Sequence, residues 1–93
     1  MNVTDATFAP AFEGAGPEWA LEVDVTGSGF EFRAAPVVAQ VGEVPVERIV
    51  FKLENDGFVG LLRQQPDAGD KLQVGYLDVG LTETNIEFQP LVA

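Results

Sequence analysis

The sequence contains no cysteine and no histidine, and both absences narrow its chemistry. Without cysteine the chain can form no disulfide bond, no thiolate metal site and no cysteine nucleophile. Without histidine it lacks the side chain that most often serves as general base and as transition-metal ligand. Ser28 and Tyr76 therefore have no histidine to activate them as nucleophiles. We expect no catalytic activity, no cofactor and no metal site.

Positive charge is also scarce, because five lysines and arginines face fifteen acidic residues, for a net charge of −10. A nucleic-acid backbone or an anionic membrane surface would repel this chain, so we expect neither as a partner. The acidic excess either keeps the protein soluble, which is the interpretation we favour, or forms a face that docks on a basic partner. Acidic residues such as Asp67, Asp70 and Asp78 fall in expected turns, where they are common. Loop carboxylates can also hold calcium, but these lack the spacing of an EF-hand.

Long apolar runs are missing as well. No segment approaches the ~20 apolar residues that a membrane-spanning helix needs. The opening segment from Met1 to Asp5 has neither the basic nor the apolar region of a secretory signal. We therefore expect no membrane span and no signal peptide, and the 93 residues suffice for one domain.

What the sequence does contain is strand-like alternation. From Trp19 to Thr26, apolar residues occupy every second position, which predicts a strand with one buried face. The same alternation places Trp19 and Tyr76 in the core, away from a sugar-binding surface. The Gly27 to Phe30 segment then predicts a sharp turn, because glycine tolerates backbone conformations that other residues resist.

Similar short segments follow along the chain and are separated by turn residues. Their spacing of about 8–12 residues, with no convincing helix, predicts an all-β sandwich or small barrel. Pro10 and Pro45 remove backbone donors, so the segments that contain them are expected at sheet edges. Val79 to Asn85 is expected to be a loose link. The other expected strands are Val3–Phe12, Val37–Val41, Val44–Val46, Arg48–Leu53, Phe58–Arg63, Leu72–Tyr76 and Ile86–Pro90.

The run from Val23 to Phe30 reads Val-Asp-Val-Thr-Gly-Ser-Gly-Phe and resembles a signature of IPT/TIG immunoglobulin-like domains. Phe8 to Pro10, Val41 to Val46 and Pro66 to Val74 are similar to the opening loop, middle hairpin and late loop of that family. The sequence departs from the family at Pro17-Glu18, where paired glycines are usual. The resemblance implies an immunoglobulin-like antiparallel β-sandwich of seven to eight short strands, of the early-set type, over residues 1–93. It implies no activity.

Five residues are candidate partner contacts. Phe12, Phe30 and Phe32 flank loops, where aromatic side chains can be exposed to a partner. Pro45 marks an expected edge strand, where another chain can add. Leu61 lies in a segment that is apolar on both faces, so it is either buried in a central strand or covered by another subunit.

Together these features predict a noncatalytic immunoglobulin-like protein-interaction module. The most concrete form is an accessory or decoration subunit of a larger assembly, such as a virus capsid or tail, where repeated weak contacts gain avidity. The partner would be another protein or further copies of this chain, bound through the N-terminal segment, the C-terminal strand or the edge near Pro45. The alternative is a carbohydrate-binding or spacer module associated with a polysaccharide-degrading or cell-surface system.

Overall fold

The computed structural model describes residues 2–12, 14, 16–30, 36–54 and 56–89. The described residues form strands and connecting loops, with no helix among them. The all-β prediction is therefore confirmed. In chain order the strands are β1 (Asn2–Pro10), β2 (Leu21–Ser28), β3 (Val37–Val41), β4 (Val44–Pro45), β5 (Glu47–Phe51), β6 (Gly57–Leu62), β7 (Lys71–Tyr76) and β8 (Gly80–Glu87).

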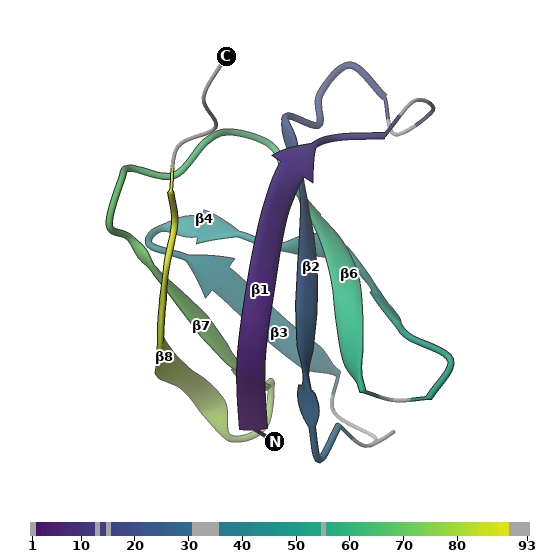
Figure 1. The fold of residues 1–93 in the computed structure, drawn as a ribbon, viewed down its shortest axis with the longest axis vertical. Coiled ribbons are helices and arrows are strands. Elements are labelled where there is room, and N and C mark those ends of the chain that lie inside the picture. Colours follow the sequence, from purple (N-terminus) through teal and green to yellow (C-terminus); the bar gives the residue numbers. More distant parts are fainter. Residues whose placement is uncertain (1, 13, 15, 31–35, 55, 90–93) are drawn as a thin grey trace.

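The strands make two antiparallel sheets that pack face to face (Figure 1). Within the described residues, one sheet has the order β1-β2-β6-β5 and the other has the order β4-β3-β7-β8. In immunoglobulin nomenclature these orders correspond to strands A-B-E-D and C′-C-F-G. The described residues therefore form an immunoglobulin-like antiparallel sandwich of eight short strands, as predicted.

The core lies between the sheets and is built from alternating positions of each strand. In β2, Leu21, Val23 and Val25 are buried while the residues between them are partly exposed. This alternation follows from the pleat, which points neighbouring side chains to opposite faces of the sheet. Edge-to-face aromatic pairs fill the two ends of the core, with Phe8 on Phe88 and Phe30 on Phe58.

Both proline predictions are confirmed. Pro10 ends β1 at the edge of the first sheet, and Pro45 lies in β4 at the edge of the second. An edge strand tolerates proline because one side of its backbone needs no hydrogen-bond partner in the sheet. A tight turn at Gly42-Glu43 joins β3 to β4, and Gly42 has the positive φ of 60° that such a turn requires.

Several predictions about strand limits are wrong. The separate strand expected over Ile86–Pro90 is instead the end of β8, which runs from Gly80 to Glu87. Strand β2 begins at Leu21, so Trp19 precedes it and does not share its inner face. The expected loose link from Val79 to Asn85 contains most of β8, which pairs with β7 from Gly80 onward. Its side chains are largely exposed, so its sequence lacks the alternation that a half-buried strand shows.

Candidate functional site

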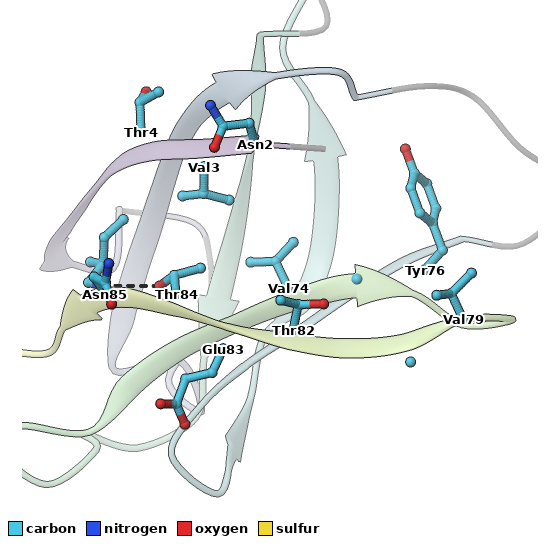
Figure 2. Close-up of a pocket in the computed structure, with 13 residues that line it drawn as sticks. Asn2, Val3, Thr4, Val74, Tyr76, Val79, Thr82, Glu83, Thr84 and Asn85 are labelled. Carbon is cyan, nitrogen blue, oxygen red and sulfur yellow. Dashed lines mark hydrogen bonds between the residues drawn. The ribbon is translucent and has the colours of Figure 1, made fainter.

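A groove opens on one side of the sandwich, between the edge strands β1 and β8 (Figure 2). Its volume is about 690 Å³. In the described residues, β1 pairs only with β2 and β8 only with β7, so each strand leaves one backbone edge unpaired in the sheets. We call this cavity the β1–β8 groove; its lining comprises Asn2 to Thr4 of β1, Val74 to Tyr76 of β7, and Val79, Gly80 and Thr82 to Ile86 around β8.

The floor of the groove is apolar and its wall along β8 carries hydroxyl groups. Figure 2 shows Val3 directed from β1 toward β7 and β8, with Val74 directed toward β1. Thr82 lies opposite the buried Val74 in the β7–β8 register and so shares its inward face. At the position where a closed sandwich would carry a large apolar side chain, β8 presents the short side chain of Thr82. The groove can therefore receive small apolar side chains from another segment.

Strand β8 is regular over only part of its length. Its register with β7 is continuous from Gly80 to Glu83 and shifts before Glu87, which marks a β-bulge. The Thr84 hydroxyl holds this bulge by donating to the Leu72 carbonyl over 2.8 Å and accepting from the Ile86 N–H over 3.1 Å. Bulges interrupt edge pairing, so the backbone available to an added strand is the segment Gly80–Glu83.

Strand β1 carries a second bulge beside the groove. Its register with β2 shifts between Val3 and Asp5, and the Thr4 hydroxyl donates to the Thr26 carbonyl over 3.1 Å. The bulge leaves Thr4 without a cross-strand partner and bends the start of β1, where the groove is lined. Both edges are thus irregular at the groove, which protects them from indiscriminate pairing with other strands.

Two glycines determine how closely β7 and β8 approach each other along the groove. A Cβ on Gly75 would collide with the Gly80 carbonyl, so only glycine fits there without a shift of the backbone. Gly80 itself has a φ of 100°, which an L-residue adopts only with strain. The close approach of Gly75 and Gly80 at the beginning of β8 therefore sets the direction in which β8 runs along the groove.

The charged side chains beside β8 are mainly acidic. Glu83 and Glu87 project from its outer face, where Lys71 lies opposite Glu87 and within 3.6 Å of Glu83. Figure 2 shows Glu83 pointing away from the groove, toward solvent. A segment that paired with β8 would therefore carry its own outward side chains past these carboxylates.

A second feature lies on the outer face of the first sheet, around Trp19. Trp19 is 7% exposed and packs on Leu61 and Ala11. The guanidinium carbons of Arg48 and Arg63 lie 5.1 and 4.5 Å from its ring centroid. The ring is thus covered by the chain itself and offers no open face on which a sugar could stack. We call these five residues the Trp19 cluster.

Backbone geometry places one of these arginines on the indole. Arg48 has a φ of 55° and lies in a register shift between Glu47 and Val50 of β5. A bulge of this kind redirects a side chain, here onto the ring of Trp19. Arg63 is held from the other side, because its Nε donates to the Glu47 carboxylate over 2.7 Å. The indole Nε1 is buried without a hydrogen-bond partner.

The predicted contact residues have different outcomes. Phe12 is 54% exposed, as expected, and Pro45 is exposed on its edge strand. The expected exposure of Phe30 is wrong, because the side chain is 4% exposed and its ring centroid lies 5.8 Å from that of Phe58. Phe32 lies outside the described residues.

Leu61 is 3% exposed and is also no surface contact. Strand β6 is central in its sheet, so Leu62 faces the main core while Leu61 faces outward. The chain covers this second apolar face with its own Trp19, and no other subunit is needed to bury it. The burial of Trp19 was predicted correctly, but its location in the main core was not.

Sequence reasoning missed the exposed apolar side chains around the start of β8. Leu77 and Val79 in the β7–β8 turn and Leu81 in β8 are all exposed, and of these three Val79 lines the groove. Because none of them is buried, their spacing of two residues does not mark a strand with one buried face.

The acidic loops show ordinary turn chemistry. The Asp70 carboxylate accepts a hydrogen bond from the Asp67 N–H over 3.0 Å, which closes the loop before β7. Across the described part of the chain, no three acidic, histidine or cysteine side chains are grouped to hold a metal ion. Within that same part, no helix has the length and apolar character required to cross a membrane.

Comparison of the chain with protein-family models, curated proteins and solved structures gives no significant match. The resemblance to IPT/TIG domains therefore stays a prediction. The immunoglobulin-like strand order is established independently by the pairing of the two sheets. Because this fold serves many unrelated functions, the groove and the surface around it must carry the functional argument.

Proposed function

We propose that this chain is a noncatalytic protein-interaction module that binds an extended segment of a partner protein in the β1–β8 groove. The observation that carries the proposal is a groove of about 690 Å³ between two sheet edges that have no further strand partner in the described residues. An added strand would gain main-chain hydrogen bonds at an edge, and its alternate side chains would enter the groove.

One exposed apolar residue in the lining supports this proposal. Val79 lines the groove and is 73% exposed. Single exposed apolar residues are common, but one in the wall of a groove adds to the apolar surface that a partner can bury. A bound segment would cover this side chain.

The form of the proposal that we favour is an accessory or decoration subunit of a larger assembly, such as a virus capsid or tail. The regular part of β8 spans only Gly80 to Glu83, so each contact with an added strand is short. A repetitive assembly raises the effective concentration of such short contacts and makes weak binding sufficient. A carbohydrate-binding module gains less support, because Trp19 and Tyr76 are buried and cannot stack on a sugar.

Selection from a displayed library of random twelve-residue peptides tests the proposal. Wild type is compared with Thr82→Trp, which fills the groove from an exposed position, and with Val50→Trp, which adds the same side chain to β5 on the opposite side. We expect wild type and Val50→Trp to enrich the same peptides, with alternating apolar residues, and Thr82→Trp to lose them. Retention of these peptides by Thr82→Trp would exclude the groove, and enrichment of no peptide by wild type would overturn the function.

A further inference from the structure

We infer that the segment bound in the β1–β8 groove is a basic strand, in which lysine or arginine alternates with small apolar residues. This inference rests on the proposed function and adds the chemistry of the partner. It follows from the side chains that a strand added to β8 must meet on each of its two faces.

The outer face next to β8 selects for positive charge. A strand added along Gly80–Glu83 would place an outward side chain beside Glu83, on the surface that also carries Glu87. Lys71 lies opposite Glu87 in the β7–β8 register, and its Nζ lies 3.6 Å from the Glu83 carboxylate. The two acids outnumber it, so a lysine or arginine from the partner would find an available carboxylate. An acidic side chain at the same place would be repelled.

The inner face selects for small apolar side chains. The groove is floored by Val3 and Val74 and walled by the hydroxyls of Thr82 and Thr84. Side chains alternate along a strand, so those that face the groove are the neighbours of those that face Glu83. A small apolar side chain such as valine or alanine would contact Val3 and Val74 on the floor of the groove.

The same charges argue against a second copy of this chain as the occupant. Each copy carries a net charge of −10, so two copies repel one another in every orientation that does not bring oppositely charged patches together. Pairing of β8 with β8 would bring Glu83 and Glu87 of both copies onto one surface, and like charges opposite each other weaken a strand pair. A basic segment removes this repulsion, which is why we assign the groove to a different protein.

Three blocked octapeptides test the inference, with valine alternating with lysine, with threonine or with glutamate. Their affinity for the full chain is measured by fluorescence anisotropy, below the concentrations at which the peptides self-associate, and amide hydrogen exchange reports the site. We expect the lysine peptide to bind most tightly, to protect amides of β8, and to lose its advantage as salt screens the charges. The glutamate peptide should bind least.

Two doubly substituted chains with the same net charge provide the matched comparison. Glu83→Gln with Glu87→Gln removes the carboxylates beside β8, while Glu43→Gln with Glu54→Gln removes two exposed carboxylates elsewhere. Loss of the cross-strand charge pair at Glu83 and of the nearby Glu87 carboxylate should weaken binding of the lysine peptide by about two- to tenfold. The remote pair should leave it nearly unchanged.

The outcomes separate this inference from the proposed function. Equal weakening by both pairs would mean general attraction to an acidic protein, and it would overturn the inference. If the threonine peptide binds as tightly as the lysine peptide and protects β8, the groove still binds strands but has no basic preference. If no peptide protects β1 or β8, the inference and the proposed function both fail.

Discussion

Replacement of Trp19 by alanine should cost far more stability than its position outside the main core suggests. The indole is 7% exposed, and a buried tryptophan removes about 150–250 Å² from water. At about 25 cal/mol per Å² this corresponds to about 4–6 kcal/mol, reduced by roughly 10–40% because the unfolded chain is already partly compact. The Arg48 and Arg63 contacts add about 0.5–1 kcal/mol each.

One term opposes this stabilisation. The buried Nε1–H of Trp19 has no acceptor, which costs about 1–3 kcal/mol relative to a hydrated indole. The balance predicts that Trp19→Ala lowers the free energy of unfolding by about 3 kcal/mol, within the range of comparable truncations. Trp19→Phe removes the unpaired N–H together with part of the ring, so the two changes offset. It should remain within about 1 kcal/mol of wild type.

Urea unfolding followed by far-ultraviolet circular dichroism measures these differences. Fluorescence cannot serve for these variants, because Trp19 is the sole tryptophan of the chain. Phe12→Ala is the matched control, since Phe12 is 54% exposed and its truncation should change stability by about 0.5 kcal/mol or less. A cost for Trp19→Ala no larger than that of Phe12→Ala would refute the packing of the Trp19 cluster. A cost for Trp19→Phe equal to that of Trp19→Ala would refute the penalty assigned to Nε1.

Five further substitutions at four positions test the backbone features, each by urea unfolding. Arg48→Gly should leave the free energy of unfolding within about 1 kcal/mol of wild type, because the backbone strain relieved at φ 55° offsets the lost contact with the Trp19 ring. Arg48→Val should lower it by about 2 kcal/mol or more, because the strain remains and the ring contact is lost. Thr84→Val should cost about 1–2 kcal/mol by leaving the Leu72 carbonyl and the Ile86 N–H without the hydroxyl that joins them, while exposed Thr82→Val should cost about 0.5 kcal/mol or less. Gly75→Ala should cost about 1–3 kcal/mol and speed amide exchange in β8, because its Cβ would push against the Gly80 carbonyl. Equal losses of stability for Arg48→Gly and Arg48→Val would contradict the strain assigned to Arg48, and equal losses for Thr84→Val and Thr82→Val would contradict the role of the Thr84 hydroxyl. A Gly75→Ala variant as stable as wild type would contradict the close approach of β7 and β8.

The parts of the fold that followed from the sequence are those in which one face of a strand is buried. In β2 the core consists of Leu21, Val23 and Val25, and their alternation is visible in the sequence because the pleat imposes it. Pro10 and Pro45 marked sheet edges for an equally local reason, the missing backbone donor. Strand β8 could not be found in this way, because it is held by backbone pairing with β7 and buries little of its surface.

The candidate site depended on tertiary relations that local patterns do not contain. Trp19 and Leu21 have the same parity, yet Trp19 packs outside the sheet, because the alternation does not extend past the start of β2. Phe30 follows a glycine turn and looked exposed, but the turn folds it back onto Phe58. The groove itself arises from the relative position of two edge strands, β1 and β8, that are far apart in the sequence.

The two open sides of a sandwich need not be equivalent, and here the chain closes one of them. Val44 and Val46 are buried where the chain passes from β4 to β5, and the Val46 N–H donates to the Ala39 carbonyl over 2.9 Å. That crossing carries the backbone from one sheet to the other and fills the space between their edges. On the opposite side, no connection in the described residues crosses between β1 and β8, and Thr82 leaves the space beside Val74 unfilled. Binding of an added strand is therefore expected on the β1–β8 side, where an unpaired backbone edge and unfilled interior space are found together.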